Sequence, residues 1–339
     1  MTESGDYVPA PHWSGHDFAS ARRVYDDKIK HTFSDAVKKN ITAESLLPES
    51  LETNSSWPMI IVCDVTGSMS DWPATIFSKL PYLEHEGKEY LGEDMEISFS
   101  AVGDANDDKY PLQVQPFAKA SDLKTNLEKL IHERGGGGTK QESYDLAALY
   151  YLHNCECPEA IHKPIMIFIG DEGLYEYVSK EQAELFAKTK LESRISLNSV
   201  FEELTEKFSV YLIRKPYRIS LNENVISGDD QIIENQWREL LGSDRIVSLP
   251  GAERVVDVIF GILAKETDRS DYFEKELKDR QLKDKDGDKK VEIVMKSLKT
   301  IYTDSKRTNK KIPIAKSKSI TKSKGANSKS KKSQSLLDD

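Results

Sequence analysis

The sequence has little cysteine and no long apolar run. Only three of the 339 residues are cysteine, and two of them, Cys155 and Cys157, are one residue apart. This odd count is not typical of a disulfide framework, so we expect reduced thiols. No apolar stretch reaches the roughly 18 residues of a membrane-spanning helix, and the N-terminus, MTESGDYVPAPHW, lacks the basic and apolar regions of a signal peptide. These absences predict a cytoplasmic protein with no membrane span.

The net charge of −9 conceals two oppositely charged parts. Residues 268–339 contain 21 Lys and Arg against 12 Asp and Glu, a net charge of +9, so residues 1–267 carry −18. Between Lys306 and Lys332 there are eleven basic residues and no acidic one, which predicts a disordered basic tail over 305–339. Its role stays open: nonspecific contact with nucleic acid, contact with an anionic membrane surface, or a tail that solubilises the chain or folds back on its acidic body. The tail has no interleaved aromatics, which argues against base stacking.

From about residue 56, short apolar runs alternate with helical patterns. Continuous apolar strands separated by helices indicate a mainly parallel sheet covered on both faces. The runs are Met59–Val65, Ile97–Val102, Leu112–Phe117, Ile165–Ile169, Phe208–Ile213 and Ile246–Leu249, and the helical patterns cover 71–84, 121–133, 140–153, 180–206, 230–241 and 252–266. We therefore predict a Rossmann-like, doubly wound α/β fold with a six-stranded sheet.

The third apolar run is an exception to the alternation. Only the turn-rich stretch GDANDDKYP separates it from the second run, and Leu112 and Val114 alternate with Gln113 and Gln115. A connection this short cannot make a parallel crossover. The pattern predicts an antiparallel edge strand over 112–117.

Two extensions flank the predicted sheet domain at 56–267. In the N-terminal extension, 1–55, a helical pattern carries apolar residues that we expect to pack on the domain. In the C-terminal extension, 268–304, a charge-dense stretch precedes a second amphipathic helix at 291–302. The apolar positions are Phe18, Ala21, Val24, Tyr25 and Ile29 in the first helix, and Val291, Val294, Met295, Leu298 and Tyr302 in the second.

Oxygen-bearing side chains follow three of the predicted elements. Asp64, Thr66 and Ser68 stand at alternate positions after the first strand, Thr139 follows four glycines, and Asp171 follows the fourth strand. Ligands of doubly wound sheets bind at the carboxyl ends of the strands, where these loops lie. A set of oxygens with two carboxylates and no His or Cys suits a hard divalent ion. The sequence thus predicts a site for Mg²⁺ or Mn²⁺.

These five residues resemble the metal-ion-dependent adhesion site of von Willebrand factor A domains. That motif is Asp-x-Ser/Thr-x-Ser with a distant Thr and a distant Asp, and Asp64, Thr66, Ser68, Thr139 and Asp171 match it in order. The resemblance covers about residues 56–267. The family's Rossmann-like sheet with one antiparallel edge strand agrees with the pattern described above.

The resemblance implies binding rather than catalysis. In this family the ion leaves one coordination position open, and an Asp or Glu of a partner protein fills it. The lack of an export signal makes the chain similar to stand-alone intracellular bacterial and phage members. Such members often act as adaptors with MoxR-type AAA+ ATPases. We therefore expect a non-enzymatic adaptor or scaffold protein.

A metal-assisted hydrolase using the same five residues is the alternative, with Glu172 as the adjacent candidate base. Aspartyl-phosphate chemistry is disfavoured because Thr66 stands where its general acid is needed. The glycine run is not a P-loop, because no Lys followed by Ser or Thr comes after it. It is not a dinucleotide-binding fingerprint either, because it lacks the G-x-G-x-x-G spacing at the start of a first βα unit.

Other motifs carry weaker predictions. His153, Cys155, Cys157 and His162 could hold zinc, although C-x-C lacks the usual two-residue spacing. The acidic stretch 284–288 resembles a calcium loop, but its glycine is misplaced and the twelfth position has no Glu, so we interpret it as a turn.

Two features beside the predicted site stay open. The acidic loop 104–108 is either a solvated turn or a determinant of partner choice. Trp72 is either a core residue or an anchor at the rim of the site.

Overall fold

The computed structural model describes residues 9–133, 139–217, 228–283 and 285–303. The basic tail predicted at 305–339 and the first residue of the acidic stretch, Asp284, lie outside the described residues.

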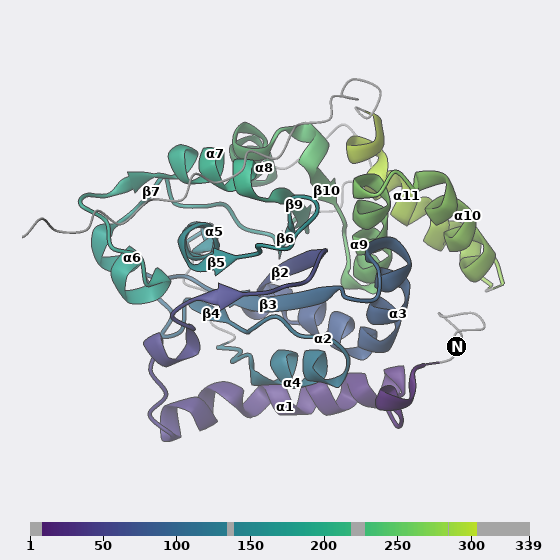
Figure 1. Ribbon diagram of the computed structural model, residues 1–339, viewed down its shortest axis with the longest axis horizontal. Coiled ribbons are helices and arrows are strands. Elements are labelled where there is room, and N and C mark those ends of the chain that lie inside the picture. Colours follow the sequence, from purple (N-terminus) through teal and green to yellow (C-terminus); the bar gives the residue numbers. More distant parts are fainter. Residues whose placement is uncertain (1–8, 134–138, 218–227, 284, 304–339) are drawn as a thin grey trace, which may run out of the picture. The chain divides into compact units, whose positions relative to one another are not determined.

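A six-stranded sheet forms the centre of the described chain (Figure 1). Its strand order is β10-β9-β6-β2-β3-β4, so that β2 is an inner strand with parallel neighbours on both sides. The strands are β2 (Pro58–Asp64), β3 (Glu96–Val102), β4 (Leu112–Val114), β6 (Ile165–Gly170), β9 (Ser209–Arg214) and β10 (Ile246–Ser248). All six predicted strands are present, and the predicted α/β class is confirmed.

Strand β4 is antiparallel to β3 and forms one edge of the sheet, as predicted. Its residues pair with the second half of β3, with Val114 opposite Ser100 and Leu112 opposite Val102. The other pairs in the sheet are parallel. The strands β2, β3, β6, β9 and β10 therefore end on the same side, and the loops that follow them meet there.

Helices cover both faces of the sheet, because alternate strand residues point to opposite sides. Ile61 and Ile167 belong to one apolar cluster, whereas Ile60 and Met166 belong to the other. The first face is covered by α2 (Asp71–Ser78), α3 (Leu80–Leu91), α4 (Ser121–Lys129) and α9 (Val255–Glu266). The second is covered by α5 (Tyr144–Asn154), α6 (Lys180–Ala187), α7 (Leu197–Lys207) and α8 (Gly228–Leu241).

Two of the predicted helices are wrong because each is divided in the structure. The pattern at 71–84 forms α2 and α3 with a break at Lys79, where Pro81 has no N–H to continue the hydrogen bonding of α2. The pattern at 180–206 forms α6 and α7. Helix α6 ends because Lys188 adopts a left-handed conformation, with φ of 46°. Between them lies β8 (Ile195–Ser196), antiparallel to β7 (Tyr177–Val178).

Both amphipathic extensions pack on the domain. Helix α1 (Phe18–Lys38) lies against α2, and Tyr25 stacks on Phe77 with ring centroids 4.4 Å apart. The sequence placed Val24 on the buried face, which is wrong, because 57% of it is exposed.

The short β1 (Leu51–Glu52) pairs with β5 (Cys155–Glu156). Two short 3₁₀ turns precede β2, at Pro11–Trp13 and Glu44–Leu46, and one follows it at Gly67–Met69. Two more lie at Ser243–Arg245 and Ala252–Arg254.

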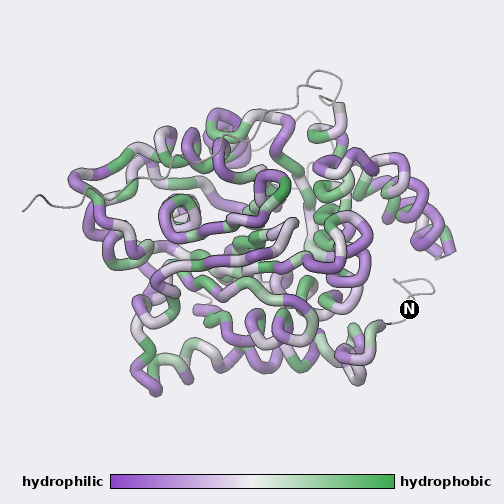
Figure 2. Tube along the Cα trace, viewed as in Figure 1, coloured by the Kyte–Doolittle hydropathy of each residue, from purple (hydrophilic) through white to green (hydrophobic). Residues whose placement is uncertain are grey.

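The C-terminal extension forms α10 (Ser270–Gln281) and α11 (Gly287–Thr303) beside α9. Figure 2 shows that α9 is mostly hydrophobic and α10 mostly hydrophilic. In α11, Val294 and Leu298 are fully buried. Gly261 of α9 leaves the space that Leu298 fills, because a Cβ at Gly261 would collide with the Leu298 side chain.

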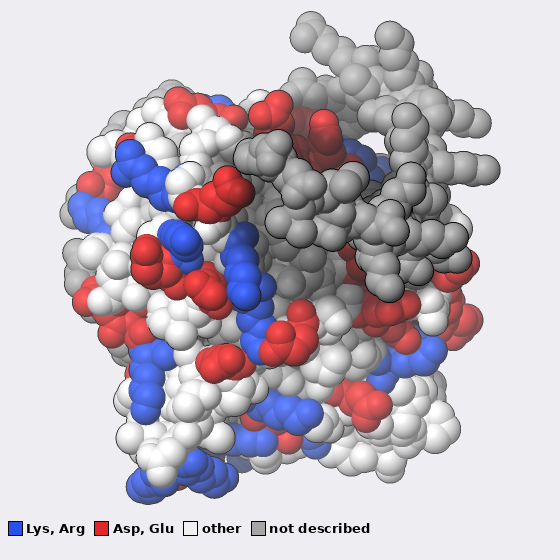
Figure 3. Space-filling model, turned by 60° about the vertical axis from the view of Figure 1, so that its left-hand side comes forward, with Lys and Arg blue, Asp and Glu red and all other residues white. Residues whose placement is uncertain are grey.

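Among the described residues, no helix is long and apolar enough to cross a membrane. On the face seen in Figure 3, acidic and basic side chains are interspersed, so the acidic excess does not form one patch there.

Candidate functional site

Asp64 is the last residue of β2, and its carboxylate is held from both sides. Its Oδ1 accepts hydrogen bonds from the Thr66 backbone N–H at 2.8 Å and from the Thr66 hydroxyl at 2.6 Å. Its Oδ2 accepts one from the Tyr144 hydroxyl at 3.1 Å. Asp64 is fully buried. These bonds fix the carboxylate at the strand end, so Asp64 is not a cap of α2.

Asp171 follows β6, the strand beside β2, and is only 1% exposed. Its Oδ2 lies 3.2 Å from the Nζ of Lys215, while its buried Oδ1 has no hydrogen-bond partner among the described residues. Lys215 follows β9 and also donates to the Ser68 carbonyl at 2.7 Å. One ammonium group thus connects the loops that follow β2, β6 and β9.

Burial and repulsion between carboxylates raise the pKa values of two carboxyl groups at this site. Burial and the negative charge of Asp171 together raise the pKa of Asp64 to about 7. Burial also raises the pKa of Glu142 to about 10, and the charges of Asp64, Asp108 and Asp104 contribute to that shift. A carboxyl group with a raised pKa favours its neutral form unless positive charge is supplied. A cation bound here would favour the ionised form of both carboxyl groups.

Thr139 hydrogen-bonds to the loop after β3 rather than to Asp64. Its side chain is exposed, and its hydroxyl donates to Asp104 at 2.9 Å and contacts the Gln141 carbonyl at 3.2 Å. Asp104 follows β3 and is 1% exposed, and both of its carboxylate oxygens accept from the Tyr175 hydroxyl. Thr139 therefore binds to the acidic loop 104–108. This loop is not a simple solvated turn, because its first residue is buried.

All five predicted residues lie at the carboxyl ends of β2, β3 and β6, with Thr139 attached there through Asp104. Asp64 contacts Thr66 directly, and Lys215 links the Ser68 backbone to Asp171. Ser68 itself is exposed. The predicted set did not include Tyr144 or Lys215.

Two features of the sequence point to Tyr144 and Lys215. Lys215 stands just after the fifth apolar run, and so at a strand end. Tyr144 follows Thr139 closely at the start of a helix. Gly170 makes room for the Tyr144 ring, because a Cβ at this position would collide with the Tyr144 hydroxyl.

Glu142 was also missed. Its backbone N–H donates to the Gly173 carbonyl at 3.0 Å, and the Gly173 N–H donates to the Lys140 carbonyl at 3.0 Å. These bonds join the segment before α5 to the loop that contains Asp171. The buried Oε2 of Glu142 has no hydrogen-bond partner among the described residues.

The oxygens present fit a divalent cation. The unpartnered Oδ1 of Asp171 and the raised pKa of Asp64 are both features that a bound cation would relieve. Within 9–133, 139–217, 228–283 and 285–303, no three His, Cys, Asp or Glu side chains are grouped to hold a metal. The set proposed from the sequence has only two carboxylates, and hydroxyl groups make up the rest.

The structure also places the candidate zinc ligands and Trp72. Cys155 and Cys157 have sulfurs 3.9 Å apart, and His162 stacks on Trp57. No three-ligand group forms around them in the described chain. Trp72 is 1% exposed and is therefore a core residue.

Glu172 lies next to Asp171 and accepts a hydrogen bond from the Tyr217 hydroxyl. Burial raises the pKa of Glu172, and the charge of Asp171 raises it further.

The sequence matches no family profile and no curated protein. Among solved structures, it is similar to the pilus adhesin SpaC from Lactobacillus rhamnosus GG in two crystal structures. The first has a TM-score of 0.46 and 11% identity over 64% of this chain and 32% of the adhesin. The second, in the open conformation, has a TM-score of 0.43 and 12% identity over 64% of this chain and 31% of the adhesin. The match spans about a third of the adhesin, which is a distant neighbour.

Proposed function

We propose that this chain is a von Willebrand factor A-type adaptor that binds a partner protein through a divalent ion. Asp64, Thr66, Ser68, Thr139 and Asp171 are the proposed ligands, directly or through water, and Mg²⁺ or Mn²⁺ is the proposed ion. The observation that supports this most is the pair of buried carboxylates, Asp64 and Asp171, after neighbouring parallel strands, with one buried oxygen of Asp171 unpartnered.

The residues of the chain prepare this site in distinct ways. Thr66 and Tyr144 orient the Asp64 carboxylate, and Gly170 admits the Tyr144 ring. Asp171 offers a buried carboxylate oxygen that has no hydrogen-bond partner among the described residues. When bound, the ion would supply an electrophilic position for an acidic side chain of the partner.

Charge favours recognition through the ion itself. Residues 1–267 carry a net charge of −18, which repels acidic partners at long range. An acidic ligand is then bound only where a cation reverses the local sign. We propose intracellular action in a larger assembly, with a MoxR-type AAA+ ATPase as the candidate companion.

Metal titration tests the site directly. Calorimetry with Mg²⁺ and Mn²⁺ should show saturable binding to the full chain, and Asp64→Asn and Asp171→Asn should abolish it. Glu86→Gln is the matched control, because Glu86 is also a buried carboxyl with a raised pKa but lies on α3. Binding that is unchanged in both Asp variants would contradict the proposed site.

Partner capture tests the function. A protein retained in Mg²⁺ should be released by EDTA and should not be retained by Asp64→Ala or Asp171→Ala. Retention that is independent of metal would exclude recognition through the ion.

A hydrolase is the second candidate, and the environment of Glu172 favours it. Its raised pKa and the bond from Tyr217 are suited to a general base beside a metal site. Turnover of phosphoesters that is lost in Glu172→Gln, with metal binding retained, would favour this alternative over the adaptor.

A further inference from the structure

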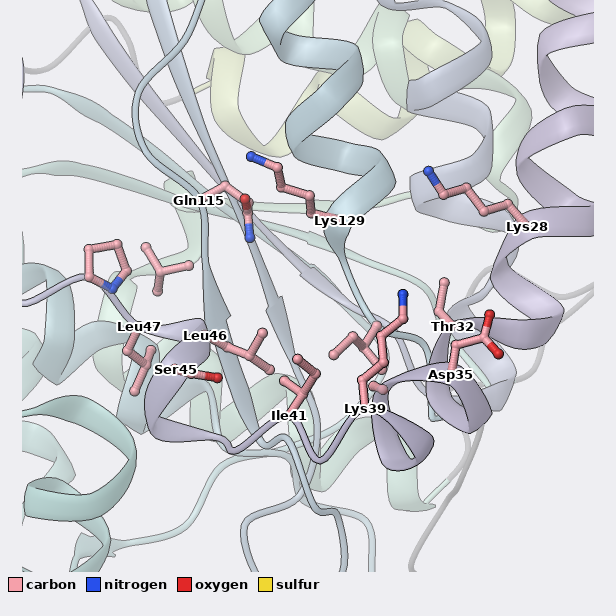
Figure 4. A pocket seen from close by; sticks show the side chains of 14 residues that line it. Lys28, Thr32, Asp35, Lys39, Ile41, Ser45, Leu46, Leu47, Gln115 and Lys129 are labelled. Atoms are coloured by element: carbon pink, nitrogen blue, oxygen red, sulfur yellow. The ribbon is translucent and has the colours of Figure 1, made fainter.

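A cavity of about 630 Å³ opens at the free edge of the sheet, away from the loops after β2 and β6. It lies between α1, the segment 41–48, the end of β4 and the end of α4. Its volume is in the range of pockets that hold small molecules, roughly 300–1,000 Å³. Figure 4 shows the side chains that line it.

The wall of the cavity is aliphatic. Ile41, Leu46, Leu47, Val114 and Ile131 contribute to it, and none of the described lining residues is aromatic. Ile41 and Leu46 are partly exposed, while Leu47 and Val114 are 4% and 2% exposed. Such a wall suits a flexible hydrocarbon body better than a planar ring, because no ring is present to stack on it.

Positive charge accompanies this wall. Lys28, Lys39 and Lys129 line the cavity with one carboxylate, that of Asp35. Lys28 pairs with Glu128 at 3.0 Å, and Asp35 lies 3.7 Å from Lys38. Among the described residues, Lys39 and Lys129 have no ion-pair partner. The cavity therefore has two ammonium groups available for an anion.

Gln115 adds a polar amide to the lining of the cavity. It is only 7% exposed, yet its side-chain amide forms no hydrogen bond with another described residue. In Figure 4 this amide and the Lys39 ammonium both point into the cavity. This amide reaches solvent in the cavity, where a polar ligand could hydrogen-bond to it.

We propose that this cavity binds an aliphatic carboxylate of the fatty-acid class. The hydrocarbon chain lies on Ile41, Leu46 and Val114, and the carboxylate accepts hydrogen bonds from the Gln115 amide and from Lys39 and Lys129. Both requirements of the cavity, burial of apolar surface and compensation of free ammonium groups, are met by this one class of ligand.

Calorimetry on the full chain tests the proposal with decanoate as the probe. Decanol, decyltrimethylammonium and acetate are the comparison probes, because they lack the charge, reverse it or lack the chain. Decanoate should bind saturably, and at least about tenfold more tightly than each of them. Decanol and decyltrimethylammonium lack the carboxylate that forms a charge-assisted hydrogen bond, which supplies about that factor, and acetate lacks the hydrocarbon chain, whose burial contributes at least as much.

Two variants and a control test whether these lining side chains are needed for binding. The double variant Lys39→Gln/Lys129→Gln changes only exposed side chains and should weaken decanoate at least about tenfold. Gln115→Leu should weaken it as well. Lys180→Gln, an exposed lysine on α6, is the control and should leave binding unchanged. Absence of saturable decanoate binding, equal binding of decyltrimethylammonium, or an unaffected double variant would each overturn the proposal.

Discussion

Lys215→Met should destabilise the chain in a way that depends on metal. The Lys215 ammonium is the cation that contacts Asp171, 3.2 Å from its Oδ2, and it also donates to the Ser68 carbonyl at 2.7 Å. Methionine keeps most of the side-chain volume but removes the charge. The variant leaves the buried Asp171 carboxylate without compensation.

The size of this effect follows from burial. Removing one partner of a fully buried ion pair costs about 3–5 kcal/mol. A quarter of the Lys215 side chain is exposed, at 25%, so solvent reduces the loss. We expect the free energy of unfolding in EDTA to fall by about 1.5–3 kcal/mol, the range for a hydrogen bond to a charged group. This corresponds to a drop of about 2–5 °C in Tm for a chain of this length.

Bound metal should restore most of the stability that Lys215→Met loses. An ion bound at Asp171 supplies the positive charge that the variant lacks, and binding to the native state stabilises it by mass action. In saturating Mg²⁺ the difference from wild type should therefore shrink to less than about 1 kcal/mol. The variant should also bind Mn²⁺ about tenfold more tightly, because no ammonium competes for the same carboxylate.

Lys207→Met is the matched control. The Lys207 side chain is 28% exposed, and its Nζ donates to the backbone carbonyls of Leu152 and Cys155. It should lose stability equally in EDTA and in Mg²⁺. Thermal unfolding followed by circular dichroism in both conditions makes the comparison. A deficit of Lys215→Met that is the same in EDTA and Mg²⁺ would refute the reasoning, because Lys215 would then be an ordinary structural lysine.

Three further predictions concern other parts of the chain. Burial, with the nearby charge of Glu276, raises the pKa of Glu86 to about 7. Below the pKa of Glu86 in the unfolded chain, its carboxyl is neutral in both states, and its burial leaves the free energy of unfolding unchanged. As pH rises from there through 7, the buried carboxyl lowers the free energy of unfolding progressively. Glu86→Gln should therefore match wild type at pH 4 and exceed it at pH 8 in urea unfolding, and a constant difference would contradict this. Gly261→Ala should cost about 1–3 kcal/mol, because its Cβ collides with Leu298; the loss should be smaller in a Leu298→Ala background. Removal of residues 305–339 should abolish salt-sensitive retention on an immobilised polyanion, if the tail binds polyanions as one of its predicted roles requires. Unchanged retention would exclude that role.

The local pattern of the sequence was sufficient for the strands and for the strand-end position of Asp64 and Asp171. Continuous apolar runs such as that of β2 report burial on both faces, and the short connection before β4 excludes a parallel crossover. The helix boundaries were less predictable. The break at Lys79 depends on one missing N–H at Pro81, and the end of α6 depends on the backbone angle of Lys188, which apolar periodicity does not report.

The sequence by itself determined the fold class, the strand-end loops that carry the proposed oxygen ligands and the charge difference between body and tail. Each of these depends on residue type and on spacing along the chain. Only the tertiary structure decided that Lys215 reaches Asp171, that Tyr144 donates to Asp64 and that Thr139 binds Asp104 instead. It also decided that Lys39, Gln115 and Lys129 line one cavity. The physical reason is that these contacts join residues far apart in the chain, so they depend on how strands and helices pack, whereas a periodic pattern records only whether a position is buried.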